Sequence, residues 1–359
     1  MRTFFAAMTC AALGAFSAAC SGAVSVAHAS NAPRFAGKSI TMIIPSTPGG
    51  GTDTTGRAIG AFLTEHLPGK PGLVIRNMPG ANGMTALNFF VRQVEADGYT
   101  ITMGSSSQAD PVHYRIPQAL YNPAEFEIIG GAGRGGTVLM INKAAMARLQ
   151  DRNAPPVMMG SLMGVPRSGM LSTAWGIEFL GWNAKWVVGY PGTNDLMLAL
   201  SRGEIDMTST GNMFQIEKFL SSGKFQVLSQ SGSLEGGAFV AREDFGGAPL
   251  FHEQMRGKIK DDIAAKGFAY WSSLTAIDKW LALPAKTPQA MVQVYREAFI
   301  NAVKDPRFSE KGKTLSEDFE PMSHEDVKML LVALNETPIE ATNYINEMLR
   351  RQGLDPGGK

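Results

Sequence analysis

Cysteine is almost absent from this chain of 359 residues, and its two copies, Cys10 and Cys20, both lie near the N-terminus. The rest of the chain therefore offers no thiol nucleophile, no disulfide and no cysteine-bound metal. The chain also lacks an excess of charge of either sign, because it has 33 basic and 32 acidic residues. Beyond residue 29 no apolar run is long enough to span a bilayer. We therefore expect no nucleic-acid partner and no stable insertion into a membrane.

The motifs of common catalytic sites are missing as well. No Gly-x-Ser-x-Gly elbow occurs, and no Gly-Lys-Ser/Thr follows a glycine-rich loop. The pattern Gly131-x-Gly133-x-x-Gly136 matches a dinucleotide fingerprint, but residues 137–141 predict a strand where that fingerprint needs a helix. The histidines beyond the N-terminal segment lack metal-ligand spacing. They are His66, His113, His252 and His324. We expect no enzyme, cofactor or metal; a carboxylate pair assembled only by the fold is the alternative left open.

The first 29 residues predict a signal peptide. Arg2 precedes an uncharged run of small and apolar residues over 4–26, and Ala27-His28-Ala29 has the small-x-small form of a cleavage site. We expect export to the periplasm with cleavage after Ala29. Lipidation of Cys20 is the alternative, although Ser17 stands where an aliphatic residue usually precedes such a cysteine.

Glycine is plentiful, and its most informative cluster is Gly49-Gly50-Gly51. It lies between a β-branched strand over 39–44 and a helical pattern over 53–67, with Thr52 or Asp53 as the predicted N-cap. Amides at a helix start that lack side-chain cover suit an anionic group. A single helix terminus contributes only about 0.3–1 kcal/mol, whereas micromolar affinity needs about 8 kcal/mol. The loop is therefore expected to be part of a larger site.

Strands and helices alternate along the first two thirds of the chain. Strands are predicted at 39–44, 73–76 and 99–103, with helices between them, which implies a parallel sheet. The loops that follow these strands, 45–53, 79–83 and 104–107, should then be neighbours. A second unit of the same type has strands at 157–162 and 185–189, and a second Pro-Gly helix start at 191–195. Two α/β lobes with a ligand cleft between them are expected.

The C-terminal third is predicted to be mostly helical. Residues 323–326 have capping-box form, and Pro338 is placed at a first helical position. The apolar stripe after the capping box is interpreted as a packing face. It consists of Val327, Leu330, Leu331 and Leu334.

A series of motifs, in order and spacing, gives the chain a resemblance to a known family. The motifs are Pro45-x-x-Pro48 followed by Gly49 to Asp53, Arg57, Asn77-x-Pro79-Gly80-Ala81-x-Gly83, Asp97-Gly98-Tyr99-Thr100 leading to Gly104-Ser105, Tyr190-x-Gly192, Gly203-Glu204-Ile205-Asp206 and Leu283-Pro284-Ala285-x-Thr287-Pro288. The chain resembles, over nearly all of its length after the leader, the solute receptors of tripartite tricarboxylate transporters, the Bug family of periplasmic binding proteins.

The resemblance implies a fold, partners and a location. It implies an α/β, two-lobed type II periplasmic-binding fold whose parallel-sheet lobes are joined by crossover strands. Lobe 1 would comprise residues 30–130 and 240–359, and lobe 2 residues 131–239. The implied partners are a small organic carboxylate and the large and small permease subunits of a membrane transporter. A monomer is expected.

The resemblance also implies a ligand site between the lobes. Backbone amides of 47–53 and the 105–107 loop would hold one polar end of the ligand, and loop 161–169 with the 192–195 helix start the other. The residues assigned to the site are Ser46, Thr47, Pro48, Gly49, Gly50, Gly51, Thr52, Asp53, Ser105, Ser106, Ser107, Arg134, Ser161, Arg167, Ser168, Tyr190, Gly192, Thr193, Asn194, Asp195 and Thr208.

Several of these residues also have structural interpretations. Asp53 and Arg57 are spaced for an i,i+4 ion pair. The serines at 105–107 could cap a helix, and Tyr190 could be a wall or core residue. Whether Arg134 or Arg167 touches the ligand stays open.

The second lobe departs from the family pattern in one respect. It has Ser168-Gly169-Met170 where the family usually has a polar pair, and its methionines Met158, Met159, Met163 and Met170 favour a ligand larger or more aromatic than citrate. Core filling is the alternative role of these methionines. We expect a receptor that delivers a carboxylate to a transporter. A ligand sensor that docks on a signalling partner is the alternative, and the identity of the carboxylate stays open.

Overall fold

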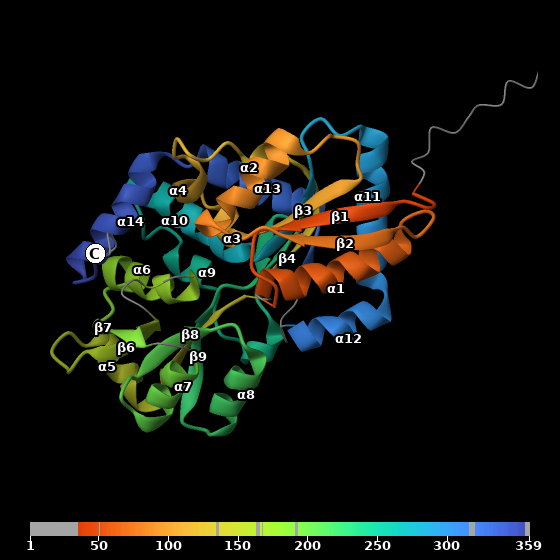
Figure 1. Ribbon diagram of the computed structural model, residues 1–359. Helices are drawn as coiled ribbons and strands as arrows, with labels where there is room; N and C mark the ends of the chain where they lie inside the picture. The colour runs from red at the N-terminus through yellow and green to blue at the C-terminus, as the bar shows by residue number, and fades with distance from the viewer. Residues whose placement is uncertain are drawn as a thin grey trace, which may run out of the picture. The chain divides into compact units, whose positions relative to one another are not determined.

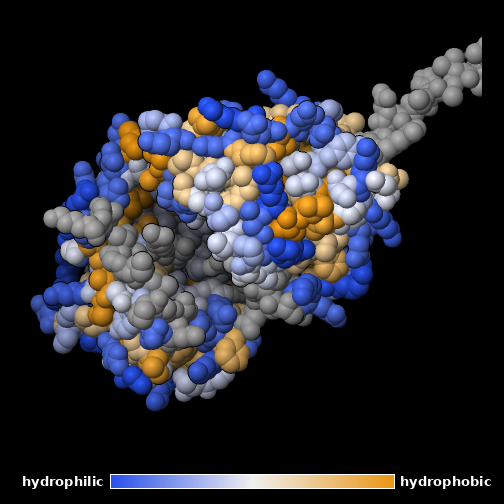
Figure 2. Space-filling model, viewed as in Figure 1, coloured by the Kyte–Doolittle hydropathy of each residue, from blue (hydrophilic) through white to orange (hydrophobic). Residues whose placement is uncertain are grey.

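The computed structural model describes residues 35–49, 51–133, 136–162, 166, 168–190, 193–315 and 320–355. Pro33–Lys359 form one compact unit. The predicted leader, its cleavage site at Ala29 and Cys20 lie outside the described residues. Among the described helices, none combines the length and the apolar character needed to cross a membrane. Figure 2 shows one face of the molecule, on which hydrophilic residues predominate and hydrophobic ones form small separate patches.

The first sheet has six strands in the order β13-β4-β12-β3-β1-β2. β1 pairs in parallel with both β2 and β3, which confirms the predicted β-α-β-α-β order. β12 runs antiparallel to β3 and β4, and β13 runs antiparallel to β4. The carboxyl ends of β1 to β4 and the amino ends of β12 and β13 therefore share one edge. The strands are Ser39–Ile44 (β1), Gly72–Asn77 (β2), Thr100–Ser105 (β3), Glu127–Gly133 (β4), Lys279–Leu283 (β12) and Glu320–Met322 (β13).

Helices cover the first sheet because their apolar stripes face it. α1 buries Ile59 and Leu63 in the same cluster as Ile40 and Met42 of β1. α13 buries the predicted packing stripe at 327–334, which confirms that interpretation. Figure 1 shows α1 beside β1 and β2, with α12 on the far side of α1. The helices of this part are Gly51–His66 (α1), Met84–Gln93 (α2), Ser106–Ala109 (α3), Pro111–Tyr114 (α4), Gln289–Lys304 (α11), Pro306–Leu315 (α12) and His324–Glu336 (α13).

The second sheet has five strands in the order β7-β6-β8-β5-β9. β6 pairs in parallel with β7 and β8, while β5 runs antiparallel to β8 and β9. Its strands are Val138–Asn142 (β5), Val157–Leu162 (β6), Ala184–Tyr190 (β7), Met207–Thr210 (β8) and Phe225–Gln230 (β9). Its helices are Met146–Gln150 (α5), Leu171–Phe179 (α6), Thr193–Arg202 (α7) and Met213–Ser221 (α8).

Two crossings of the chain join the sheets. β4 of the first sheet precedes β5 of the second, and β9 leads through a hairpin and two helices back to β12. The hairpin and the remaining helices are Ser233–Glu235 (β10), Ala238–Val240 (β11), Phe251–Met255 (α9), Asp262–Ala276 (α10) and Ile339–Arg351 (α14). Arg351, in the last turn of α14, pairs with Glu178 of α6 at 2.6 Å. One apolar cluster includes Ile128 of β4, Leu139 of β5 and Trp175 of α6. The two sheets therefore share part of their core.

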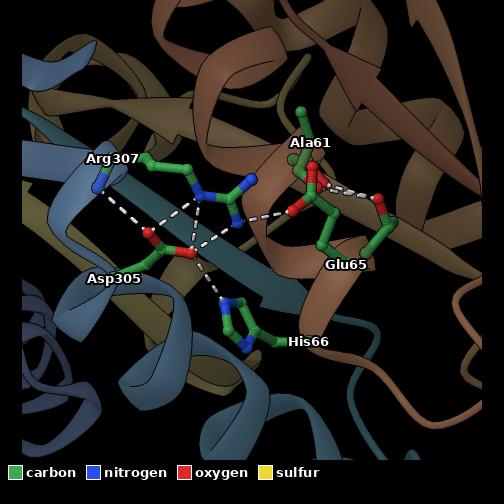
Figure 3. Close-up of polar contacts among 7 residues, drawn as sticks. Ala61, Glu65, His66, Asp305 and Arg307 are labelled. Atoms are coloured by element: carbon green, nitrogen blue, oxygen red, sulfur yellow. Dashed lines mark hydrogen bonds and ion pairs between the residues drawn. The ribbon is translucent and has the colours of Figure 1, made fainter. Parts of the chain in front are cut away.

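Helix α12 is tied to α1 by a polar network. Asp305 precedes α12, accepts a hydrogen bond from the Arg307 backbone N–H at 2.9 Å, and pairs with the Arg307 guanidinium at 2.6 Å. Arg307 also pairs with Glu65 of α1 at 2.8 Å, and His66 Nε2 lies 3.5 Å from the Asp305 carboxylate (Figure 3). The Arg307 side chain, by hydrogen bonding, holds the pKa of Asp305 well below its usual range. We interpret this network as structural.

The predicted element boundaries are close to the observed ones. The strands at 39–44 and 157–162 match, and the strand predicted after Gly136 is β5, so the dinucleotide interpretation is excluded by the local fold. Two capping predictions are wrong by a residue or two. α1 begins at Gly51, so Asp53 lies inside its first turn, and Pro338 is the N-cap of α14. Ser323 caps α13 as predicted, accepting from Asp326 N–H at 3.0 Å.

Candidate functional site

A cavity of about 120 Å³ is lined by residues from the carboxyl edges of both sheets. From the first sheet it is lined by Ser106 after β3, Gly133 at the end of β4 and Asp278 before β12. From the second it is lined by Thr137 before β5 and Ser231 after β9. Ligands of α/β proteins collect beyond the carboxyl ends of parallel strands. The volume is below the roughly 300–1,000 Å³ of drug-sized sites, which favours a small ligand.

Backbone hydrogen bonds fix the first-sheet side of this cavity. Ser106 N–H donates to the Asp278 carbonyl at 3.1 Å, and Asp278 N–H donates to the Ala132 carbonyl at 3.1 Å. The indole N–H of fully buried Trp280 donates to the Ser105 carbonyl at 3.1 Å. The end of β3 is therefore held rigidly in place beside β12.

Hydroxyl groups fix the second-sheet side. Thr137 N–H donates to Ser231 Oγ at 2.7 Å, and Ser231 N–H donates to the Thr137 carbonyl at 2.9 Å. The two side-chain oxygens are 3.5 Å apart. The segments before β5 and after β9, which are the two chain crossings, are thus joined at the cavity wall. A ligand that contacts these hydroxyls would contact both chain crossings.

The carboxylates on the cavity rim are neutralised by partners. Asp278 pairs with the buried ammonium of Lys279 at 2.7 Å. Glu320 lies 4.0 Å from the Arg242 guanidinium. Among the described lining residues no side chain carries an unpaired positive charge. An anionic group in the cavity would therefore meet hydroxyls and backbone N–H groups of the described residues.

The glycine loop that the sequence singled out is organised by Asp53. The Asp53 carboxylate accepts hydrogen bonds from Gly49 N–H at 2.8 Å and Asn77 Nδ2 at 2.8 Å, and pairs with Arg57 Nε at 2.9 Å. The predicted i,i+4 ion pair is confirmed. These bonds, chiefly the one from Arg57, lower the pKa of Asp53 to about 2. The carboxylate is 3% exposed, so its role in the structure is to shape the loop.

Replacing Asp53 by asparagine should destabilise the protein in a pH-dependent way. The amide would place donors against the donors of Gly49, Asn77 and Arg57, at a cost of about 1–3 kcal/mol in the free energy of unfolding. The wild-type advantage should be complete above the ordinary aspartate pKa of 3.8 and shrink as the pH falls toward 2. Urea unfolding between pH 7 and pH 2 measures it, with Glu217→Gln as an exposed control. A difference that is constant with pH would contradict this role.

The predicted neighbourhood of the three loops is confirmed by contacts. Asn77 Nδ2 donates to the Ser46 carbonyl at 3.0 Å, and Gln108 Nε2 donates to the Asn82 carbonyl at 2.7 Å. Of the predicted first-lobe residues, Ser106 lines the cavity, whereas Pro48, Gly49 and Asp53 line an open depression between α1 and α12.

The neighbouring serines have local roles. Ser105 caps α3, forming a capping box with Gln108, which is the structural interpretation left open for these serines. The Ser107 carbonyl lies 2.9 Å from His113 Nδ1. Ser106 remains the serine of this loop that reaches the cavity.

The second-lobe residues of the predicted site are more scattered. Ser161 and Thr208 are fully buried, and Thr208 Oγ1 donates to the Gly160 carbonyl at 3.2 Å. Burial raises the pKa of half-buried Tyr190. Asp195 is exposed in the first turn of α7. None of these four is among the described residues that line the cavity.

Several predicted residues cannot be placed around the site. Gly50, Arg134, Arg167 and Gly192 lie outside the described residues, as does Met163, and the side chains of Ser168, Thr193 and Asn194 are likewise not described. Of the other second-lobe methionines, Met159 is fully buried, and Met158 and Met170 are half-buried. Core filling is thus the observed role of Met159.

Sequence reasoning missed most of the cavity lining. Thr137, Ser231, His252 and Ser272 come from four separate segments, and no local motif marks them. Lys279 could have pointed to Asp278 in the cavity lining, because a charged residue in an otherwise apolar strand needs a buried partner. No group of three or more potential metal ligands occurs among the described residues.

Comparison with known proteins supports the family resemblance. A Bordetella pertussis protein of the UPF0065 group is 26% identical over 296 residues, which span 79% of this chain and 82% of that protein. Protein BugT of the same organism is 36% identical over 77 residues, 21% of this chain and 23% of BugT. The resemblance to the Bug family is confirmed. No family model matches the chain.

Solved structures of similar fold are also known. A TctC solute-binding protein from Polaromonas, without ligand, has a TM-score of 0.64 at 17% identity and covers 89% of this chain and 100% of its own. An R. palustris protein with adipate has a TM-score of 0.50 at 20% identity, covering 89% and 98%. The two-lobed binding-protein fold is confirmed.

Proposed function

We propose that this protein is a periplasmic solute receptor that binds an organic carboxylate in the cavity between the two sheets and delivers it to a tripartite tricarboxylate-type transporter. The cavity carries the proposal, because both sheets and both chain crossings contribute to its wall. A ligand held there would couple binding to the relative position of the lobes. The Bug-family resemblance and the adipate held by the R. palustris neighbour support the choice of a carboxylate.

We propose that the site serves binding rather than catalysis. Its described carboxylates, Asp278 and Glu320, lie beside the cations of Lys279 and Arg242. The hydroxyl of Ser231 accepts a hydrogen bond from the backbone N–H of Thr137. The predicted lobe boundaries remain part of this proposal. Of the residues assigned to the 46–53 and 105–107 loops, it keeps Ser106, because Pro48, Gly49 and Asp53 line the separate depression between α1 and α12.

Titration calorimetry tests the proposed function. A panel of aliphatic and aromatic carboxylates that includes adipate, malate, citrate and benzoate is titrated into the protein lacking residues 1–29. At least one carboxylate should bind with a Kd of about 10 μM or lower, near 7–8 kcal/mol. The absence of heat and of any thermal shift with every member would contradict the proposal.

Arg134 is proposed as the cation of the site, because its sequence neighbours Gly133 and Gly136 both line the cavity. Arg134→Gln should weaken every carboxylate that binds by about 10- to 100-fold, the worth of one charge-assisted hydrogen bond. Arg167→Gln is the matched comparison, since Arg167 was the other open candidate. An unchanged affinity in Arg134→Gln with a loss in Arg167→Gln would reverse the assignment.

Transport and sensing use the same ligand site, so binding alone does not separate them. We propose transport on the family resemblance. Deleting the gene should abolish uptake of the bound carboxylate by whole cells. Normal uptake, together with loss of a transcriptional response to that carboxylate, would favour the sensor.

A further inference from the structure

One end of the cavity is walled by aromatic rings around a histidine. The imidazole of His252, on α9, stacks on Phe239 of β11 with ring centroids 4.1 Å apart and planes at 15°. Its ring also lies 6.4 Å from that of Trp271 of α10, at 18°, and 5.4 Å from that of Phe268, edge to face. His252, Phe239 and Trp271 line the cavity, and so does Ser272, the next residue of α10. The imidazole is thus held in a fixed orientation at the cavity wall.

Polar atoms at this end have no partner in the described protein. Both ring nitrogens of His252 and the hydroxyl oxygen of Ser272 are buried without a hydrogen bond. Ser272 is only 6% exposed. Buried polar groups in proteins are nearly always hydrogen-bonded, so three such atoms beside one cavity mark a place where a ligand supplies the missing partner.

The chemistry of these atoms selects the partner. Burial lowers the pKa of His252 to about 4, so the ring is neutral at pH 7. A neutral imidazole offers one donor and one acceptor, and the serine hydroxyl offers both. An ionised carboxylate only accepts, and here it would be desolvated against an uncharged wall. A hydroxyl group both donates and accepts, and therefore fits this end of the cavity.

The same segments add both apolar and polar residues to the wall. The apolar ones are Leu234, Leu274, Ile277 and Met322, and Ser233 and Thr275 are polar. An engineered apolar cavity of about 150 Å³ holds benzene, and the volume here, about 120 Å³, is of the same order. The body of the ligand is thus limited to a single ring or a chain of similar bulk.

We propose that the ligand is a compact ring carboxylate that bears a hydroxyl group, and that His252 and Ser272 bind this hydroxyl while the hydroxyls of Ser106, Thr137 and Ser231, which line the same cavity, hold the carboxylate. This inference rests on the proposed function and adds the class of the substrate and two specificity-determining residues.

Matched pairs of ligands test it. 3-Hydroxybenzoate and 4-hydroxybenzoate are each titrated against benzoate. The wild-type protein should bind at least one of the hydroxybenzoates about tenfold or more tightly than benzoate, since one satisfied hydrogen bond accounts for that ratio. His252→Phe keeps the ring stack and removes both nitrogens. In this variant the affinities for hydroxybenzoate and benzoate should differ by no more than about threefold, and the affinity for benzoate should be unchanged.

Ser272→Ala is the second variant, because it removes the hydroxyl with little change in volume. It should lower the same ratio. Ser201→Ala, at an exposed serine of α7, is the control and should leave it unchanged. Melting temperatures of all variants verify folding, and Ser272→Ala carries the test if His252→Phe does not fold.

The outcomes separate this inference from the proposed function. If carboxylates bind but the hydroxyl gives no preference, or if both variants keep the wild-type ratio, the inference is overturned and the receptor function stands. If neither the benzoates nor any carboxylate of the calorimetry panel binds, the receptor function fails, and the inference fails with it.

Discussion

Ser106→Asp should abolish most carboxylate binding while leaving the fold intact. Ser106 lines the cavity and occupies the first position of α3 after the N-cap Ser105. An acidic residue is tolerated in the first turn of a helix, so the variant should fold. A carboxylate placed about 4–6 Å from the bound carboxylate costs about 3 kcal/mol at an effective dielectric constant of 20, which weakens binding more than 100-fold.

Ser106→Asn separates charge from size. Asparagine has the shape of aspartate and no charge, so binding should stay within about tenfold of the wild-type value. Calorimetry with the tightest carboxylate of the panel measures both variants. Equal losses in the two would mean that space and not charge matters at this position, and no loss in either would remove Ser106 from the site.

Gly104→Ala should be the most destabilising single substitution considered. A Cβ atom at Gly104 would lie 2.0 Å from the ring of Trp280, which is fully buried and pairs in register with Gly104 across β3 and β12. Overpacking of this kind costs about 1–3 kcal/mol and occasionally more. Because Trp280 also binds the Ser105 carbonyl, displacement of its ring should shift Ser106 and weaken ligand binding as well.

Gly51→Ala is the matched control for this substitution. A Cβ at Gly51, in the first turn of α1, meets no atom within 4 Å. Alanine should be neutral or stabilise α1 by up to about 1 kcal/mol, since it restricts the unfolded chain. Urea unfolding measures both variants. A Gly104→Ala protein as stable as wild type would contradict the close packing of β3 on Trp280.

The sequence predicted local features well because single segments determine them. The strand at 39–44 ends in Pro45, and Ser323 marks a helix start, so each was recognisable without knowing what packs against it. The start of α1 was misplaced because Asp53 bonds backward to Gly49 and sideways to Asn77. The contact with Asn77 joins residues 24 positions apart, and such a contact leaves no local pattern.

The candidate site was only partly predictable for the same reason. Ser106 was found because it follows a strand of the first parallel unit, whose carboxyl edge can be inferred from strand order. Thr137 and Ser231 meet across 94 positions, and the His252 ring reaches Phe239 and Trp271 only through the tertiary fold. In the sequence, His252 is one of several scattered histidines, and its role follows from its neighbours.

The crystal structure of the protein purified from its native host with co-purified ligand, or with the tightest carboxylate of the panel, tests the central claim most directly. We predict one carboxylate in the cavity, within hydrogen-bond distance of Ser106 and of the Thr137–Ser231 pair. An empty cavity with the ligand bound elsewhere, such as in the open depression between α1 and α12 beside Arg57 and Arg307, would contradict the account.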